Sequence, residues 1–393
     1  MPGLPAFCLR PRDLRRGAVL TLAFLAAVAT GALTGCWEHE EGAAAAEVRT
    51  DLPASGASRA AGTADRDAVA RAAAEAVAEG KSGKKAAQDV VSRSGDRWGT
   101  VYDQGEYAAF AEGLDGHWTG VGVWAERAHD GVIKVDKVQP GSPAARAGLR
   151  TGDRLLSVDG HAVTGLAVTE VVALLRGTAG TPVVLNLSRD GADLTETVRR
   201  EQLRTEPVTV RQRPDGVTVI KVTSFTRGSG ERVRAAVRAA PAGAGVMLDL
   251  RGNPGGLVTE AVTAASAFLD GGLVATYDVR GDQRVLYAAP GGDTTRPLVA
   301  LVDGGTMSAA ELVTGALQDR GRAVAVGSRT FGKGSVQMPT ELPDGSVAEL
   351  TVGTYRTPAG RSLDGEGITP DVPAGERAEE RAVTVLGGLG VGP

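Results

Sequence analysis

Cysteine, histidine and lysine are all scarce in this chain of 393 residues, which has only two cysteines and four histidines. Two cysteines cannot build a disulfide framework or a cysteine-rich zinc site, and four scattered histidines argue against a dedicated metal centre. Acidic residues (47) outnumber basic residues (43), so the chain lacks the basic surplus that nucleic-acid binding uses. We therefore expect no metal, no cofactor and no nucleic-acid partner.

Arginine takes the place of lysine almost throughout the chain. The seven lysines are Lys81, Lys84, Lys85, Lys134, Lys137, Lys221 and Lys333. In such a chain, a lysine inside a catalytic domain is a candidate for a chemical role, because a buried lysine can lose its charge and arginine cannot.

The first 36 residues have the three parts of a secretory signal. Four arginines precede an apolar run at residues 18–33, and the run ends in Leu33-Thr34-Gly35-Cys36. This ending resembles a bacterial lipobox, which implies that Cys36 would be acylated after cleavage. Two alternatives stay open: an uncleaved anchor, since about 18 apolar residues can span a bilayer, and a signal in which Cys36 has no role. In each case we expect export, with the protein either secreted or associated with the cell membrane through its N-terminus.

The residues that follow the signal predict a tether and a helical segment. Residues 37–64 are rich in Ala, Gly, Ser and Glu without an apolar period, which predicts a flexible linker. Residues 65–117 predict a small helical segment, in which Asp65 is the candidate N-cap of a helix that runs to about Glu79. No motif in this segment indicates chemistry.

Residues 118–200 alternate short strands and glycine turns with one amphipathic helix at 168–175. Their motifs are Pro-Gly-Ser-Pro-Ala (140–144), Ala-Gly-Leu (147–149), Gly-Asp (152–153) and Val-Asp-Gly (158–160). This pattern resembles a PDZ domain of the kind linked to bacterial proteases. The resemblance implies that backbone N–H groups of a loop hold the C-terminal carboxylate of a peptide, here the loop of Gly120, Val121, Gly122 and Val123. The alternative is that these glycines only form a turn.

Residues 201–375 alternate apolar strands with helices, which predicts an α/β domain with a largely parallel sheet, followed by a C-terminal tail at 376–393. In such sheets, sites form where strands end. The first candidate is the turn at 249–257, Asp-Leu-Arg-Gly-Asn-Pro-Gly-Gly-Leu, between a predicted strand and helix. Its glycines suit an oxyanion better than a phosphate, because the Walker and dinucleotide-binding spacings are absent. The alternative is a tight turn without chemistry.

The second candidate is Ser308, in another turn between a strand and a helix. A serine at a strand end is exposed, and the N–H of the next residue is available to an oxyanion. Serine is also a common helix N-cap, so the position alone favours neither role.

A nucleophilic serine needs a base, and this domain contains no histidine. All four histidines precede Arg200: His39, His117, His129 and His161. A triad would need a histidine from another segment, whereas Lys333 follows the strand after the Ser308 helix and lies between two glycines. Close packing at the glycines would desolvate the lysine and lower its pKa, which makes it a candidate base.

Together these motifs resemble the C-terminal processing peptidases, or tail-specific proteases. The resemblance rests on the 249–257 turn, Thr-Met-Ser-Ala-Ala-Glu-Leu (306–312), Arg-Thr-Phe-Gly-Lys-Gly-Ser-Val-Gln (329–337), Thr-Tyr-Arg-Thr-Pro-Ala-Gly-Arg-Ser (354–362) and Gly-Ile-Thr-Pro-Asp-Val (367–372). It implies a Ser–Lys dyad, an oxyanion hole and a positioning glutamine, which would be formed by Ser308, Lys333, Gly255, Ala309 and Gln337. It also implies a core of the ClpP/crotonase kind. Met307 and Ala310 depart from the family's usual small residue and second serine.

The expected function is an exported serine endopeptidase that cuts proteins near unstructured C-termini recognised by its PDZ domain. Its partners would be protein or peptide substrates with free C-termini, and a homo-oligomer is compatible with the family. The alternatives are a catalytically silent envelope scaffold with a PDZ domain and, more remotely, an acyl-CoA enzyme of the crotonase kind. A PDZ module linked to a catalytic domain could also block the site until a peptide binds.

Overall fold

The computed structural model describes residues 63–128, 131–279 and 282–390. The predicted signal with Cys36, and His39 and His129, lie outside these residues. The chain divides into two compact units: one contains Gly116–Thr205, and the other combines residues 63–115 with residues 206–390. The two units are described separately.

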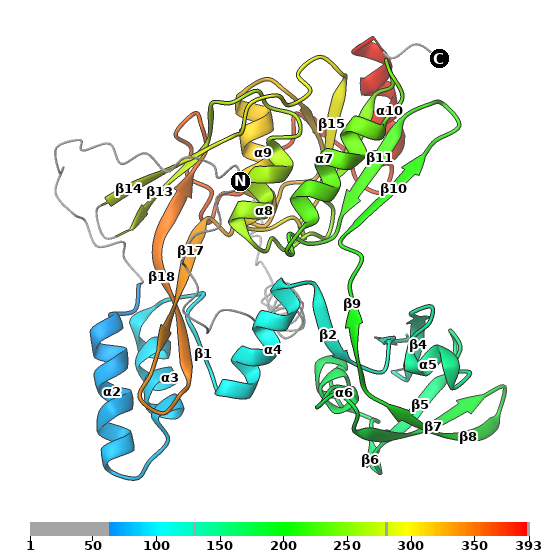
Figure 1. Ribbon diagram of the computed structural model, residues 1–393, viewed down its shortest axis with the longest axis vertical. Coiled ribbons are helices and arrows are strands. Elements are labelled where there is room, and N and C mark those ends of the chain that lie inside the picture. Colours follow the sequence, from blue (N-terminus) through cyan, green and yellow to red (C-terminus); the bar gives the residue numbers. More distant parts are fainter. Residues whose placement is uncertain (1–62, 129–130, 280–281, 391–393) are drawn as a thin grey trace, which may run out of the picture. The chain divides into compact units, whose positions relative to one another are not determined.

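In the larger unit, a six-stranded sheet carries the predicted α/β core (Figure 1). Its strands follow the order β10 (Val208–Gln212), β11 (Thr218–Val222), β12 (Val246–Asp249), β15 (Leu298–Val302), β16 (Val324–Gly327) and β19 (Val372–Pro373). All neighbouring pairs are parallel except β10–β11. The strands β12 and β15 are buried along their whole length, as expected of parallel strands with both faces covered.

Helices cover both faces of this sheet. On one face α7 (Ser229–Ala239), α8 (Val258–Ala265) and α9 (Ala309–Asp319) share a core with Ile220 and Leu248. On the other face α10 (Ala378–Gly388) packs on Met247 and Leu301. The structure thus differs from the expected C-terminal tail, because apolar residues at four-residue spacing within α10 are buried against the sheet: Ala378, Ala382 and Leu386.

A second sheet belongs to the same unit and contains a long hairpin. It comprises β1 (Thr100–Tyr102), β18 (Val347–Arg356), β13 (Leu273–Val279) and β14 (Asp282–Tyr287), with β17 (Ser335–Glu341) paired to β18. The helices α2 (Arg66–Ala78) and α3 (Gly83–Ser94) lie beside the β17–β18 hairpin, and α4 (Gln104–Leu114) follows β1 (Figure 1). Asp65 caps α2 as expected, since its carboxylate accepts the N–H groups of Asp67 and Ala68.

The N-terminal helices and the hairpin share one small core. Val69 of α2, Val91 of α3 and Val101 of β1 pack with Ala348 and Leu350 of β18. The predicted helical segment is therefore continuous in structure with the domain that begins more than 100 residues later, because the helices and the hairpin bury apolar faces against one another.

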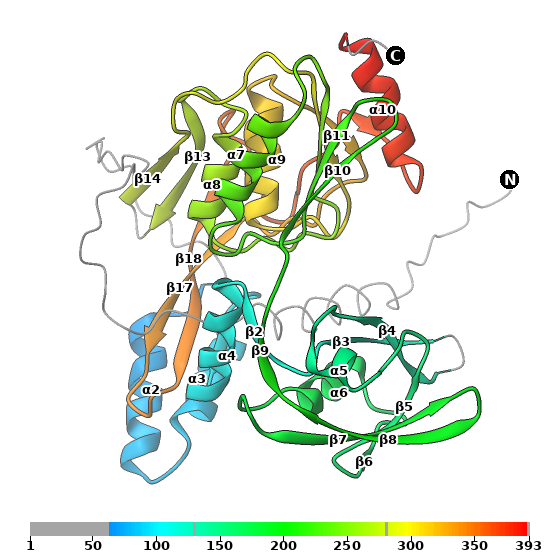
Figure 2. The same ribbon diagram turned by 45° about the vertical axis from the view of Figure 1, so that its right-hand side comes forward.

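The smaller unit contains a six-stranded antiparallel sheet. Two short helices pack with this sheet (Figure 2). Its strands follow the order β3 (Val123–Arg127), β4 (Ile133–Val138), β5 (Arg154–Val158), β7 (Pro182–Arg189) and β8 (Ala192–Arg199), and β6 (His161–Ala162) pairs with β5. The helices are α5 (Pro143–Arg146) and α6 (Val168–Leu175), and β2 (His117–Gly120) pairs with β9 (Glu201–Arg204) at the ends of the unit. Alternate residues of β7 are buried, so one face of the sheet forms the core.

Candidate active site

Ser308 lies between β15 and α9 in a strained backbone conformation. Its φ is 51° and its ψ is −120°, in a region that a non-glycine residue adopts only when its surroundings enforce it. The N–H of Glu311 donates to the Ser308 carbonyl oxygen at 2.8 Å, and Glu311 Oε2 accepts the Ser308 N–H at 2.8 Å. The helix start is thus held by the backbone and by Glu311.

The turn after β12 approaches the Ser308 turn closely. A Cβ at Gly255 would lie 3.0 Å from Ser308 Cβ and 3.1 Å from Ala309 N, and the Gly255 φ of 103° also favours glycine. Glycine at this position therefore leaves open the space in front of the Ala309 N–H. In the described residues no acceptor receives this N–H, which begins α9, where the helix dipole favours negative charge.

The two predicted oxyanion residues differ in what their N–H groups do. The Gly255 N–H donates to Oδ1 of the fully buried Asn253 at 2.8 Å, so it is already engaged in this structure. The Asn253 side-chain amide donates in turn to the Val222 carbonyl oxygen at 3.0 Å. Among the described residues, the Ala309 N–H thus has no acceptor and the Gly255 N–H has one.

Lys333 lies in the loop between β16 and β17, and the glycines on either side are required by packing. A Cβ at Gly334 would lie 2.2 Å from Asp364 N, and one at Gly332 would lie 3.2 Å from Gly365 C and Gly367 N. The expected close packing is confirmed. Burial lowers the pKa of Lys333, and the carboxylates of other residues oppose this shift: Glu349, Asp96 and Glu311.

A residue that the sequence analysis did not select, Glu311, joins the two candidate catalytic segments. It is fully buried, and its Oε2 accepts the N–H groups of Ser308 at 2.8 Å and Lys333 at 2.9 Å. Its Oε1 accepts the Thr330 hydroxyl at 2.5 Å and the Gly332 N–H at 2.7 Å. Burial raises the pKa of Glu311, and the four donors oppose this shift. The available signal was its position three residues after Ser308, where a glutamate commonly bonds the N-cap N–H.

The side chains of the predicted dyad are not joined by a hydrogen bond in the described part of the chain. Lys333 Nζ lies 5.0 Å from the centroid of the Trp98 ring. Trp98 belongs to the loop between α3 and β1. The Gln337 amide donates to Ser335 Oγ at 2.8 Å and Thr351 Oγ1 at 3.4 Å rather than contacting Lys333. The structure therefore brings the backbones of Ser308 and Lys333 together and leaves the lysine side chain on Trp98.

In the smaller unit, the predicted peptide-binding loop is packed tightly. A Cβ at Gly122 would lie 2.2 Å from Ser142 Cβ, and the Gly122 φ is 89°. The carbonyl oxygens of Val121 and Gly122 accept the N–H groups of Ala144 and Gln139 at 2.8 Å. Val121 is buried in the core of the unit, so its contribution to any peptide site is its backbone.

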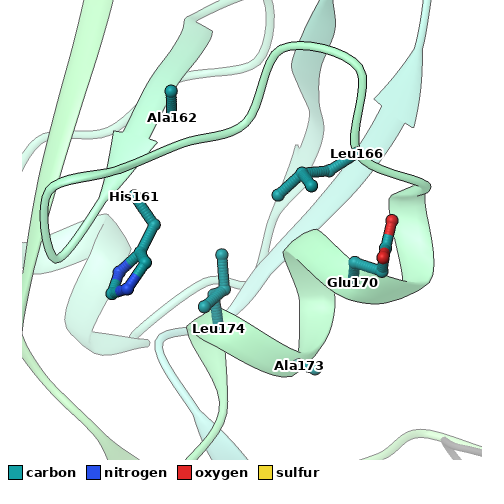
Figure 3. A pocket seen from close by; sticks show the side chains of 6 residues that line it. All are labelled: His161, Ala162, Leu166, Glu170, Ala173 and Leu174. Carbon is teal, nitrogen blue, oxygen red and sulfur yellow. The ribbon is translucent and has the colours of Figure 1, made fainter.

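A separate apolar hollow of about 450 Å³ lies between β6 and α6 (Figure 3). His161, Ala162 and Leu166 line one side, and Glu170, Ala173 and Leu174 of α6 line the other. The Glu170 carboxylate accepts the Ala167 N–H at 2.6 Å and so caps α6. None of the four predicted loop residues lines this hollow.

Neither a metal cluster nor a membrane span is found in the described residues. No group of three or more His, Cys, Asp or Glu residues among them could hold a metal ion. Their helices are also all too short or too polar to cross a bilayer.

Comparison with known proteins defines the class: a peptidase-type α/β domain combined with a PDZ domain. Residues 216–374 match the model of peptidase family S41, and residues 134–189 match that of a PDZ domain. The chain is 35% identical over 284 residues to the carboxy-terminal processing protease CtpA of Bacillus subtilis, covering 71% of this chain and 61% of that protein. It is 36% identical over 252 residues to a carboxy-terminal-processing protease of Bartonella bacilliformis, covering 61% and 58%.

Solved structures agree with this class. The photosystem II D1 C-terminal processing protease is 30% identical, with a TM-score of 0.51 over 78% of this chain and 86% of that one. A putative S41 protease from Bacteroides fragilis, 20% identical with a TM-score of 0.51 over 74% and 81%, shares the fold. The chain belongs to peptidase family S41, among the C-terminal processing peptidases with a PDZ domain. It spans about three fifths of the length of the curated relatives it matches.

Replacing Gly255 should slow the reaction of Ser308. The new Cβ of Gly255→Ala would occupy the space beside Ser308 and the Ala309 N–H. We expect labelling of Ser308 by a fluorophosphonate probe to slow by about 100-fold, the range for loss of one oxyanion donor. Gly252→Ala is the matched control, because Gly252 also has a positive φ in this turn but open space around its Cβ. Equal labelling rates in the two variants would contradict this role of Gly255.

Glu311→Gln should also slow the labelling of Ser308. An amide group in place of one carboxylate oxygen would face two N–H or O–H donors instead of accepting from them. We expect at least about tenfold slower labelling, since each hydrogen bond to a charged group contributes about 1.5–3 kcal/mol. Glu260→Gln is the control, because Glu260 likewise accepts two N–H groups, of Gly228 and Gly230, at the start of α7. An unchanged labelling rate in Glu311→Gln would show that the hydrogen bonds of Glu311 are not needed to position Ser308.

Proposed function

We propose that this protein is an exported serine endopeptidase that cuts proteins near unstructured C-termini, with Ser308 as nucleophile and Lys333 as general base. The observation that carries the proposal is that one carboxylate binds both residues: Glu311 accepts the backbone N–H groups of Ser308 and Lys333. The names of relatives as carboxy-terminal processing proteases support the same substrate class.

In the proposed reaction, the Ser308 hydroxyl attacks the carbonyl carbon of the scissile peptide bond. Neutral Lys333 accepts the hydroxyl proton, and the Ala309 N–H at the start of α9 stabilises the oxyanion. The tetrahedral intermediate collapses to an acyl-enzyme as the Lys333 ammonium returns the proton to the leaving amine. Water activated by Lys333 then releases the acyl group and restores Ser308. Lys333 Nζ must leave the Trp98 ring to reach Ser308, and we assign the placement of the lysine during this step to Gln337.

The proposed peptide-binding site is the segment Gly120 to Val123, which runs from the end of β2 to the start of β3. Backbone N–H groups there would hold the terminal carboxylate, and the peptide would add a strand beside α6. The tight packing of Gly122 on Ser142 supports a preformed loop.

Two further parts of the proposal concern the core and the location. Parallel strands β11, β12, β15 and β16, with α7 to α9 on one face, support a core of the ClpP/crotonase kind. The signal-like sequence of residues 1–36 supports export, with attachment to the membrane through the N-terminus or through Cys36.

A silent PDZ scaffold is the second candidate. The observation that favours it is the position of Lys333 Nζ on Trp98, without a hydrogen bond to Ser308 in the described residues. In that case a fluorophosphonate probe would label Ser308 under no condition.

Ser308→Ala and Lys333→Ala should each abolish cleavage of an unfolded substrate with an apolar C-terminus, leaving the circular dichroism spectrum unchanged. The expected loss is at least about 1,000-fold, because nucleophile and base act as a unit. The controls are Ser328→Ala, an exposed serine after β16, and Lys221→Ala, at the end of β11 nearest Asp249. Full activity of Lys333→Ala would exclude the dyad.

Amidation of the substrate's C-terminus should reduce kcat/KM about tenfold, because a lost charge-assisted contact is worth about 1.5–3 kcal/mol. Gly122→Ala should reduce cleavage of the free-carboxylate peptide to the level of the amidated one, since its Cβ would collide with Ser142. Gly165→Ala, with a positive φ and open space, is the control. Equal cleavage of both peptides by the unmodified protein would rule out carboxylate recognition.

A further inference from the structure

The loop that carries Lys333 packs against the N-terminal segment at Trp98. Lys333 Nζ lies 5.0 Å from the centroid of the Trp98 ring, and the Phe331 ring lies 5.7 Å from the same ring. The indole thus contacts the loop through two residues that flank Gly332. The indole Nε1 is buried without a hydrogen-bond partner in the described residues. The indole side chain therefore contacts the lysine loop through its ring and not through its N–H group.

Trp98 is anchored through Asp96, which is 8% exposed. The Asp96 carboxylate accepts the N–H groups of Trp98 at 3.1 Å and Gly99 at 2.9 Å. It also accepts the N–H of Thr351 at 2.9 Å and its hydroxyl at 2.7 Å. Because Thr351 belongs to β18, the position of the indole is determined by the hairpin whose first strand begins two residues after Lys333.

Charged groups near Lys333 Nζ oppose the burial that lowers the pKa of this lysine. The carboxylates that act on it come from three elements: Glu349 on β18, Asp96 on the loop before β1 and Glu311 on α9. No direct ion pair joins them to Lys333 in the described residues, and burial raises the pKa of Glu349 to about 7. The exposed Arg97 also has its guanidinium 5.4 Å from the Trp98 ring. An aromatic face binds an ammonium group but has little attraction for a neutral amine.

We propose that the Trp98 ring is a holding site for the Lys333 ammonium, and that Trp98 is a positioning residue which sets how readily Ser308 acquires its base. On this ring the charged lysine can accept no proton. When Nζ loses its proton to solvent, its attraction to the ring and the carboxylates is lost, and the neutral amine moves to accept the Ser308 hydroxyl proton. The N-terminal segment thereby controls the fraction of molecules with an active nucleophile. This inference rests on the proposed Ser–Lys dyad.

The test is the rate at which a fluorophosphonate probe labels Ser308 in the full-length protein, measured from about pH 5 to about pH 10, across the range in which a lysine with a lowered pKa loses its proton. Removing the Trp98 ring, or the charge of a carboxylate that opposes the shift, should lower the pKa of Lys333 and move the rising limb of the rate profile to lower pH. We expect Trp98→Leu to shift the midpoint by about one pH unit, so that labelling below the midpoint is about tenfold faster. Trp98→Phe should shift it less, because phenylalanine binds cations more weakly than tryptophan. Glu349→Gln should shift it in the same direction.

Glu341→Gln is the matched control, because Glu341 is an exposed carboxylate on the same hairpin that does not act on Lys333. Its midpoint should equal that of the unmodified protein. A lower plateau with an unmoved midpoint in both Trp98→Phe and Glu349→Gln would show that these residues are only structural and would overturn the inference. Labelling of Lys333→Ala at the unmodified rate would instead overturn the dyad itself, so the two failures are distinguishable.

Discussion

One buried carboxylate holds the candidate active site together. Glu311 accepts four hydrogen bonds, and their donors come from the Ser308 turn and from the loop of Thr330 to Lys333. A carboxylate without solvent costs several kcal/mol unless donors surround it, so the two segments and Glu311 require one another. The strained backbone of Ser308 is compatible with folding because its N–H is bound at the correct position.

Close backbone packing around this carboxylate defines the rest of the site. Gly255 faces Ser308 with no space for a side chain, and Gly334 packs on Asp364 in the same way. The packing at Gly334 belongs to the buried surroundings that lower the pKa of Lys333, which is what the proposed role of this lysine as a base requires.

The N-terminal segment is a structural part of the site. Its helices share a core with the β17–β18 hairpin, and Asp96 and Trp98 extend from that core to Thr351 and Lys333. The smaller unit forms its own core around strands such as β7, and the loop proposed to bind peptides is shaped within that unit by the turn at Ser142. The chain thus combines a peptidase unit of two sequence segments with a PDZ unit inserted between them.

Local features could be predicted from the sequence because they depend on neighbouring residues. The alternation of strands and helices, the glycine turns and the cap at Asp65 follow from local periodicity and backbone preference, and the spacing of motifs identified Ser308 and Lys333 as candidates. What only the tertiary structure decided are contacts between distant segments: Glu311 on the lysine loop, Asp96 on Thr351, and Trp98 on Lys333. The packing of α10 on the sheet also belongs to this group. Burial and hydrogen-bond partners depend on which faces meet when the chain folds, and the residue pattern of a single segment does not contain that information.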